Sequence, residues 1–315
     1  MRILVTGGLG VNGAMVVEQL LTGGHHVTVF DASEDTSLLG PARDSVAIHC
    51  GDIRDPAAVD SIVAAGRIET IIHLAALLTV AAEANPALAL DVNVLGMRNV
   101  MSTAVNHDVG RVVFASSKAI YGPLRCSHGA PSYRPVSEDH PFQPNNFYDY
   151  TKAMCEGIGR KFAQRSGLEF AALRFGTIFG PGRSVRHQSR LQHSALIEAA
   201  IAGAPFTATT PGRDRDDIVY VGDVADALVG AASAERLTHP AYNISRGALE
   251  SLHSLRDAVL EVIPDARLEV NDEESESLAY SCVFDCDRAR TDFGFNPASA
   301  LSESVRQYID HVRRG

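Results

Sequence analysis

A glycine-rich turn between an apolar strand and an apolar helix is the feature that most constrains how this chain can fold. Residues 6–13 read Thr-Gly-Gly-Leu-Gly-Val-Asn-Gly. The run before them, Arg2–Val5, is typical of a buried parallel strand, and Ala14–Leu21 after them has the apolar spacing of a helix. A strand, a glycine turn and a helix in this order predict a site for the pyrophosphate of a dinucleotide.

Each glycine of the turn has a physical purpose in such a site. Gly7 allows the tight turn, Gly10 lets the backbone approach the phosphates, and Gly13 lets the helix pack closely against the strand. The helix N-terminus adds free N–H groups and the positive end of its dipole. The expected cofactor contacts in this turn are Gly7, Gly10, Val11, Asn12 and Gly13.

A second predicted strand, His26–Phe30, ends in an acidic residue, Asp31. An acid at about this position binds the adenosine ribose in dinucleotide-binding folds. Its carboxylate would repel a 2′-phosphate, and no arginine follows it at once, so the sequence favours NAD over NADP. The alternative is that Asp31 merely begins a turn.

Composition excludes several classes of partner. The chain has 315 residues, a net charge of −10 and a pI near 5.6, which argues against a nucleic-acid-binding surface. Met1 leads straight into the first strand, so we expect no signal peptide, and no apolar stretch is long enough to span a bilayer. We therefore expect a cytoplasmic protein without nucleic-acid or membrane partners.

The five cysteines are scattered and odd in number, so we expect no disulfide framework. Cys282 and Cys286 have a spacing that invites a metal interpretation, but no second pair or nearby histidine completes a site. We interpret them as packing positions and expect no metal.

Strands and helices alternate through the first half of the chain, which predicts a parallel sheet covered on both faces. Helices are expected at Pro56–Ala65, Pro86–His107 and Tyr148–Ser166, and a long loop at Pro123–Asn146. The further predicted strands are Val46–Cys50, Thr70–Leu74, Arg111–Ala115 and Phe170–Arg174.

We therefore predict an α/β fold, a doubly wound parallel Rossmann sheet with a smaller C-terminal α/β lobe that binds substrate. Residues 1–175 would form the NAD-binding domain, and 217–247 would return to it through strands at Ile218–Val221 and Ala241–Ile244. Residues 176–216 and 248–315 would form the smaller lobe.

A tyrosine and a lysine four residues apart, Tyr148 and Lys152, are the main candidates for chemistry. On a helix this spacing puts both side chains on one face. A tyrosine is a poor base at neutral pH, but a nearby ammonium and a positive nicotinamide ring would stabilise its phenolate. Tyr150 competes for this assignment, although its spacing to Lys152 places it on another face.

At this point the chain resembles the extended short-chain dehydrogenases/reductases, specifically their NAD-dependent epimerase/dehydratase branch, over essentially its whole length. The stretches that carry the resemblance are 6–13, Asp31, Gly51–Ile53, His73–Ala76, Asn93–Gly96, Ser116–Gly122, Tyr148 with Lys152, Leu173–Arg174 leading to Gly180–Gly182, and Val221–Ala225.

The resemblance implies roles for matching residues. Tyr148 would move the proton and Lys152 would bind the nicotinamide ribose. Ser117 would hydrogen-bond the reacting oxygen, with Ser116 as the alternative, and Asn93 would support a proton relay. Further cofactor contacts implied are Asp52, Ile53, Leu74, Ala75, Ala76, Asn93, Ser116, Tyr148, Lys152 and Phe175, and the substrate contacts are Leu78, Thr79, Ser117, Tyr148, Thr177, Arg183 and Arg215.

Departures from the family pattern narrow the reaction. Lys118-Ala119 stands where dehydratases and decarboxylases usually carry acids, which disfavours elimination and decarboxylation. Thr177 stands where many nucleotide-sugar enzymes have an asparagine, and Asp216 where they place an arginine for the diphosphate. Arg183, Arg213 or Arg215 could replace that arginine, or these residues could form a solvated loop.

Leu77–Thr79 and Glu83–Pro86 are similar to the corresponding loop of short-chain L-threonine dehydrogenases. The resemblance to the epimerase/dehydratase branch implies reversible hydride transfer at a secondary alcohol of a sugar or nucleotide-sugar, with epimerisation through a ketone, and the loop makes a small hydroxy acid or free sugar a competing substrate. Net oxidation of a small hydroxy acid or free sugar is the alternative, and a non-catalytic NAD sensor a remote one. The resemblance also implies a homodimer, paired through Pro86–His107 and Tyr148–Ser166.

Overall fold

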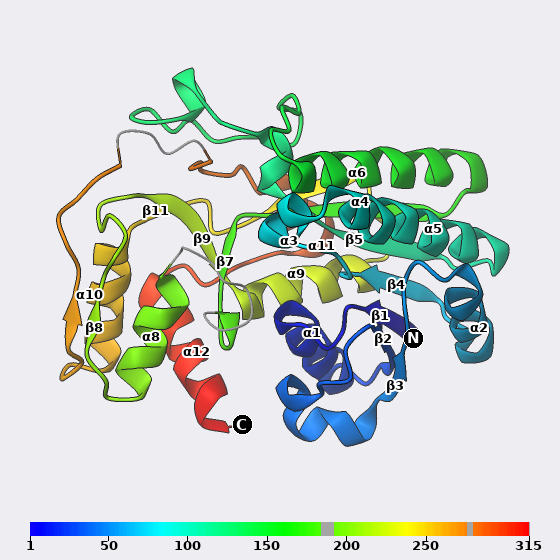
Figure 1. Cartoon of the computed structure of the whole chain (residues 1–315), viewed down its shortest axis with the longest axis horizontal. Helices are drawn as coiled ribbons and strands as arrows, with labels where there is room; N and C mark the ends of the chain where they lie inside the picture. Colours follow the sequence, from blue (N-terminus) through cyan, green and yellow to red (C-terminus); the bar gives the residue numbers. More distant parts are fainter. Residues whose placement is uncertain (184–191, 276–279, 315) are drawn as a thin grey trace.

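The apolar runs of the sequence form a seven-stranded parallel sheet in the order β10-β6-β5-β4-β1-β2-β3 (Figure 1). The structure, a computed structural model, describes residues 1–183, 192–275 and 280–314. The order reverses between β1 and β4, so the loops that follow these two strands open a crevice at the carboxyl edge of the sheet. The strands are β1 (Arg2–Thr6), β2 (His26–Asp31), β3 (Ala47–Cys50), β4 (Thr70–His73), β5 (Arg111–Ser117), β6 (Glu169–Phe175) and β10 (Ala241–Ile244).

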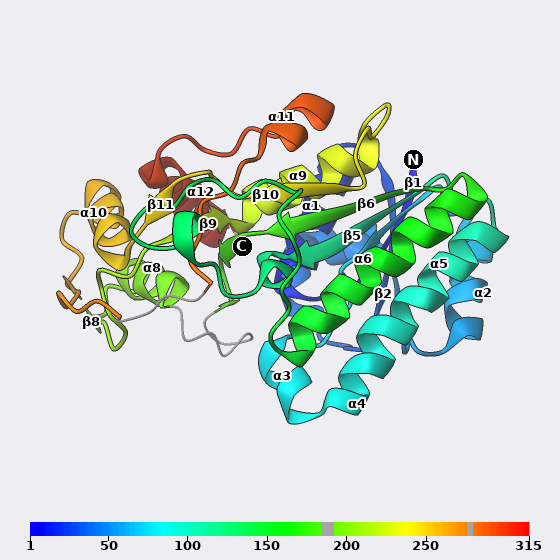
Figure 2. The same ribbon diagram turned by 90° about the horizontal axis from the view of Figure 1, so that it is seen from above.

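Helices cover both faces of this sheet, as Figures 1 and 2 show. Leu4 and Val112 pack on one face with α2 (Pro56–Gly66), α5 (Gly96–Asn106) and α6 (Phe147–Ser166). Ile3 and Val5 face the other way, toward α1 (Val11–Thr22) and α9 (Val221–Ser233). The alternation of apolar neighbours between the two cores confirms the predicted doubly wound α/β fold.

The predicted helix from Pro86 to His107 is continuous but changes its winding. It consists of α4 (Pro86–Ala89), a π-helical turn η2 (Leu90–Leu95) and α5. Such turns occur mostly as insertions in α-helices, often at functional sites. Here the π-helical turn carries Asn93, whose buried side chain joins two parts of the site described below.

The helix that carries the tyrosine–lysine pair has clear end signals. The Asn146 side chain accepts from the backbone N–H of Asp149 at 3.0 Å and caps α6. Gly167 follows the last turn with a φ of 77°, a conformation that glycine adopts without strain. The helix therefore begins one residue before Tyr148 and runs along the sheet for 20 residues.

A smaller group of strands and helices lies beyond the carboxyl edge of the sheet. Its three-stranded sheet, in the order β11-β9-β7, consists of β7 (Thr177–Phe179), β9 (Asp216–Tyr220) and β11 (Leu249–Glu250). The expectation that Ile218–Val221 returns to the main sheet is therefore wrong, because β9 pairs with β7 and Val221 already begins α9. Only Ala241–Ile244 joins the main sheet, beside β6.

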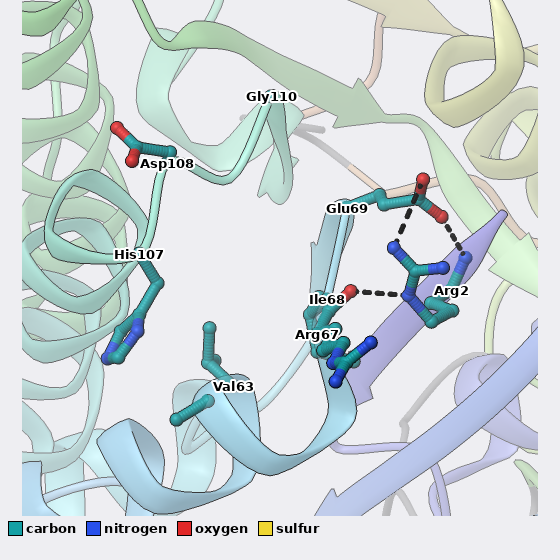
Figure 3. Close-up of a pocket in the computed structure, with 9 residues that line it drawn as sticks. Arg2, Val63, Arg67, Ile68, Glu69, His107, Asp108 and Gly110 are labelled. Carbon is teal, nitrogen blue, oxygen red and sulfur yellow. Dashed lines mark hydrogen bonds and ion pairs between the residues drawn. The ribbon is translucent and has the colours of Figure 1, made fainter.

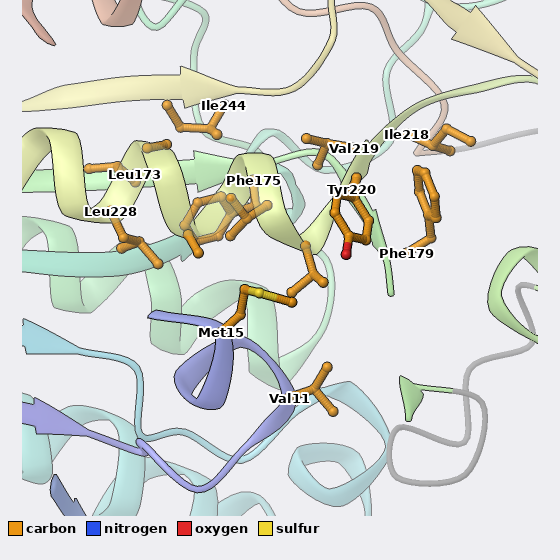
Figure 4. Close-up of a cluster of buried hydrophobic side chains, with 14 of the residues drawn as sticks. Val11, Met15, Leu173, Phe175, Phe179, Ile218, Val219, Tyr220, Leu228 and Ile244 are labelled. Carbon is orange, nitrogen blue, oxygen red and sulfur yellow. The ribbon is translucent and has the colours of Figure 1, made fainter. Parts of the chain in front are cut away.

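One continuous hydrophobic core links this smaller group to the large sheet. Phe179 and Tyr220 pack in the same cluster as Phe175 and Met15 (Figure 4). The proposed assignment of 1–175 with 217–247 to one domain and 176–216 with 248–315 to a second lobe remains our interpretation. The described elements of the smaller lobe also include α8 (His193–Ile201), β8 (Phe206–Thr207), α10 (Leu252–Val262), β12 (Leu268–Glu269) and α12 (Leu301–Arg314).

The remaining elements are short helical segments in the connections between strands and longer helices. They are η1 (Ser37–Ser45), α3 (Thr79–Ala84), η3 (Lys118–Tyr121), η4 (Cys126–His128) and α11 (Asp287–Phe293). Within the described ranges, no helix has the length and apolar character needed to cross a membrane.

Candidate active site

The glycine-rich turn lies against the loop that follows β4. Gly7 has a φ of 74°, and a Cβ placed on it would lie 2.7 Å from the backbone nitrogen of Ala75. A Cβ on Gly13 would lie 2.2 Å from the carbonyl oxygen of Gly7. Side chains are thus excluded at both positions, and the backbone forms a narrow cradle at the switch point of the sheet.

Helix α1 begins at this cradle without a side-chain cap and without an acidic residue in its first turn. Its Ncap residue is Gly10, and Val11 and Asn12 form the start of the helix. An uncapped N-terminus of this length offers backbone donors and a positive dipole end to a phosphate. These features fit the pyrophosphate of a dinucleotide.

Asp31 is fixed against the same turn. Its Oδ2 accepts from the backbone N–H of Leu9 at 2.9 Å, and its Oδ1 accepts from that of Ser33 at 2.9 Å. The bond from Ser33 closes a local turn, as expected if Asp31 merely begins a turn. The bond from Leu9 joins the end of β2 to the glycine-rich turn, so the carboxylate sits where the cofactor ribose would lie next to the bound pyrophosphate.

Ser117 and Tyr148 come from different elements, and the Ser117 side chain lies close enough to the phenol of Tyr148 to lower its pKa. Ser117 is the last residue of β5, and Tyr148 lies in the first turn of α6. Lys152, one turn further along α6, donates from Nζ to the carbonyl of Ala115 at 2.6 Å. Tyr150 is 53% exposed, so Tyr148 is the tyrosine that faces the serine.

The electrostatics of the pair are set mainly by burial. Burial raises the pKa of Tyr148 to about 12, although the hydrogen bond with Ser117 and the charge of Arg183 both lower it. Burial also lowers the pKa of Lys152 to about 8, against the raising effect of Cys155 and Glu156. The protein's own groups therefore keep the tyrosine protonated, and a positive nicotinamide ring is the further charge that would favour the phenolate.

Asn93 ties the loop after β4 to α6. Its Oδ1 accepts from the N–H of Leu77 at 2.7 Å, and its Nδ2 donates to the carbonyl of Leu77 at 3.1 Å and to Oγ1 of Thr151 at 2.9 Å. Both amide hydrogens are thus used within the protein. Asn93 positions the loop, and its part in a proton relay remains a prediction.

Ser116 points away from Tyr148. Its hydroxyl donates to Oε1 of buried Glu156 at 2.7 Å, and Arg174 binds the same carboxylate at 2.9 and 2.7 Å. This geometry favours Ser117 over Ser116 as the group next to the reacting oxygen. The sequence analysis missed the buried Glu156–Arg174 ion pair, since the two residues lie 18 positions apart.

Two departures from the family pattern, Lys118 and Asp216, form an ion pair. Asp216 also accepts from the hydroxyl of Thr177 and from the backbone N–H groups of Asp217 and Cys282. Burial opposes the charge on Lys118, but the charge and hydrogen bond of Asp216 raise the pKa of the ammonium overall. The pair thus cancels its own charge beside Ser117.

The remaining residues predicted for the site differ in their exposure, and some of them are buried in the core. Asp52 binds Arg54 at 2.8 Å on the surface, while the side chain of Ile53 is buried. Leu74, Ala75 and Ala76 lie partly exposed after β4, and Leu78 and Thr79 are exposed where α3 begins. Phe175 is buried in the core, and Arg215 lies exposed over the ring of Tyr133 at 5.5 Å.

A surface hollow of about 520 Å³ lies at the opposite edge of the sheet, before β1, β4 and β5 (Figure 3). Arg2 donates there to Glu69 at 2.7 Å and to the carbonyl of Arg67 at 2.6 Å, so its main polar groups bind one another. Ligands of doubly wound sheets bind at the carboxyl edge, and this hollow is not part of the candidate site.

Fold and site together define a class, a doubly wound dinucleotide-binding enzyme with a tyrosine and a lysine at the catalytic position. Comparison with known families agrees, because residues 3–245 match the NAD dependent epimerase/dehydratase family. The chain belongs to this family and is an NAD-dependent enzyme.

Individual relatives span nearly the whole chain. A putative UDP-glucose 4-epimerase of Methanocaldococcus jannaschii is 28% identical and covers 99% of this chain and 98% of its own length. The mitochondrial L-threonine 3-dehydrogenase of Bos taurus is 29% identical, with 98% and 82% covered. The solved UDP-glucose 4-epimerase of Thermus thermophilus in complex with NAD superposes with a TM-score of 0.80, at 28% identity and 99% coverage of both chains.

Proposed function

We propose that this enzyme epimerises a secondary carbinol of a sugar or nucleotide-sugar through a ketone. The observation that carries the proposal is the meeting of Ser117, Tyr148 and Lys152 beside the glycine-rich cradle. Bound NAD would supply the hydride acceptor and return the hydride in the second half of the reaction.

The protein's part is to move one proton and to hold the reacting oxygen. The Tyr148 phenolate takes the hydroxyl proton as the carbinol becomes a ketone, and it returns that proton after the ketone accepts hydride on its other face. The Ser117 hydroxyl donates a hydrogen bond to the reacting oxygen. Lys152 holds the ribose of the cofactor and places a positive charge behind the tyrosine.

Both similar epimerases named above act on UDP-glucose according to their names, which supports a nucleotide-sugar as substrate. Lys118-Ala119 after the serine supports epimerisation over elimination, because no carboxylate follows Ser117 to handle a second proton. The Lys118–Asp216 pair next to Ser117 has no net charge, which supports a substrate that places a hydroxyl rather than a phosphate against this pair.

A second candidate is net oxidation of a small hydroxy acid or free sugar. It is favoured by the threonine dehydrogenase relative and by the similar loop at Leu77–Pro86. The chemistry at Tyr148 would be identical, but the ketone would leave and NADH would accumulate.

The deciding experiment incubates the purified protein with NAD and, separately, UDP-glucose, UDP-galactose, free sugars, sugar acids and L-threonine. Isomer formation without net NADH supports the epimerase, and stoichiometric NADH supports the dehydrogenase. The Tyr148→Phe variant serves as the control for contaminating activity. NAD binding without turnover of any member of this panel would contradict both, and would favour the sensor interpretation.

We also propose a homodimer in the cytoplasm. Within the predicted helix Pro86–His107, the apolar residues Val94, Met97, Val100 and Met101 are buried within the single chain and do not offer a surface for a dimer. Support comes instead from exposed apolar side chains on η2 and α6 and from a shallow apolar hollow on α6 at Met154, Ile158 and Phe162. The exposed residues are Leu90, Leu95, Phe147, Tyr150 and Met154. All five cysteines are free, which fits a reducing compartment.

A further inference from the structure

A residue of the smaller lobe reaches the cofactor cradle. Arg183 follows the turn Gly180–Gly182, and its Nη1 donates to Oδ1 of Asn12 at 3.1 Å. A Cβ on Gly182 would lie 3.5 Å from the side chain of Leu38 and 4.0 Å from that of Val11, so this turn packs against the start of α1. The guanidinium therefore lies at the first turn of the helix that receives the pyrophosphate.

The charge of Arg183 is not compensated by an acid. Several other buried cations in the described chain have carboxylate partners: Arg111 with Glu169, Arg174 with Glu156, Arg246 with Glu250 and Lys118 with Asp216, whereas buried Lys152 binds the carbonyl of Ala115. Within residues 1–183, 192–275 and 280–314, no carboxylate pairs with Arg183. Burial lowers its pKa to about 10, against a raising effect from Tyr148. A guanidinium without a counter-ion at a helix N-terminus is suited to an anionic ligand.

We propose that Arg183 is a ligand of the dinucleotide pyrophosphate, supplied to the cradle by the smaller lobe. The pyrophosphate carries two negative charges, whereas a helix end provides only about half a positive charge. A planar guanidinium can bind two phosphate oxygens at once and supplies the missing charge. To bind the phosphates, the Arg183 side chain must give up one hydrogen bond among the described residues, the one that it donates to Asn12.

The same guanidinium connects cofactor binding to the catalytic tyrosine. Its charge acts on Tyr148, which lies on α6 on the far side of the crevice from α1. Arg183 thus contacts the first turn of α1 through Asn12, and its charge lowers the pKa of the Tyr148 phenol. The sequence analysis placed this residue with the substrate, whose diphosphate has the same chemistry, so the test must distinguish the two sources.

The test measures binding and does not depend on which carbohydrate the enzyme converts. The variants are Arg183→Met, which removes the charge, and Arg183→Lys, which keeps the charge but loses the fork. Arg290→Met is the matched control, because this exposed arginine of α11 binds only Asp287 at 2.8 Å. The probes are NADH and ADP-ribose, which contain the pyrophosphate, adenosine, which lacks it, and UDP as the mimic of a substrate diphosphate.

Arg183→Met should weaken NADH and ADP-ribose about ten-fold or more and leave adenosine unchanged, as expected for a lost charge-assisted bidentate contact. The affinity of Arg183→Lys for NADH and ADP-ribose should lie between those of the wild type and Arg183→Met. The affinity of Arg290→Met should equal that of the wild type. Unchanged adenosine binding and an unchanged melting temperature show that the variant is folded. If NADH affinity is unchanged, the proposal is wrong: a loss confined to UDP then assigns Arg183 to the substrate, and no loss at all makes it a structural residue.

Discussion

The ammonium of Lys152 lies 5.6 Å from the centroid of the Tyr148 ring and is held in place by the carbonyl of Ala115. The lysine is 3% exposed and has no carboxylate partner in the described residues, so its charge acts on the ring and on whatever occupies the crevice. Together with the bond from Ser116 to Glu156, this contact joins α6 to β5, the strand that ends at Ser117.

Tyr148→Phe should leave fold and NAD affinity intact and lower turnover by about 10² or more, the scale of a lost positioned acid/base group. The variant loses one hydroxyl, which donates or accepts the proton in both half-reactions. Tyr150→Phe is the control and should keep most activity, since Tyr150 is exposed. The assignment would be refuted by near-normal turnover of Tyr148→Phe measured with the true substrate.

The rate should rise with pH, because the deprotonated tyrosine is the proton acceptor. Burial holds the pKa of Tyr148 at about 12 in the protein alone, and the nicotinamide charge must lower it for activity at neutral pH. A pH profile of kcat should show an apparent pKa well below that of free tyrosine. Lys152→Met removes a cation from behind the ring, so it should move this pKa upward and weaken NAD binding; an unmoved profile would contradict this role.

NAD should bind much more tightly than NADP. We expect the Asp31 carboxylate to accept hydrogen bonds from the ribose hydroxyls and to repel a 2′-phosphate. Asp31→Ala should reduce the difference between the affinities for NAD and NADP, because it should weaken NAD binding more than NADP binding. Calorimetric titration measures both affinities. Asp31→Asn removes the charge but keeps one acceptor oxygen, so it can retain one of the two bonds from the N–H groups of Leu9 and Ser33 and is a milder variant than Asp31→Ala. Equal wild-type affinities for the two cofactors would overturn the prediction.

Stability should fall as the pH is lowered from 6.5 toward 4. Burial lowers the pKa of His193 to about 4 from 6.5, so between these values the unfolded chain binds a proton that the folded chain excludes. The difference amounts to roughly 3 kcal/mol when complete. Denaturant unfolding across this range should show a weaker pH dependence for His193→Gln. Part of the pH dependence that remains in His193→Gln should come from His73, because burial lowers the pKa of His73 in the same way.

Light scattering at micromolar concentration should give the mass of a dimer. Met154→Glu places a charge in the apolar surface of α6 and should shift the protein to monomer. Val312→Glu changes an exposed apolar residue of α12, away from α6, and this variant should remain dimeric. A wild-type monomer would reject the homodimer.

The sequence predicted the cradle and the catalytic pair because each depends on local pattern. Gly7 and Gly13 sit in a glycine-rich stretch of eight residues between a strand and a helix, and the four-residue spacing of Tyr148 and Lys152 fixes their common face. The position of β9 was missed because a short apolar run fits any sheet, and its partner β7 was hidden in a Gly/Pro-rich stretch. The ion pair between Glu156 and Arg174 depends on packing of α6 against β6, which periodicity alone does not reveal.

Lys118 and Asp216 are separated by 98 positions in the chain, yet they behave as one unit. Replacing either residue alone would leave the charge of the other without a partner next to Ser117. An engineer who wants a different substrate must therefore exchange the two together. Libraries of single substitutions would therefore reject both positions as intolerant, because neither charge keeps its partner when the other is replaced.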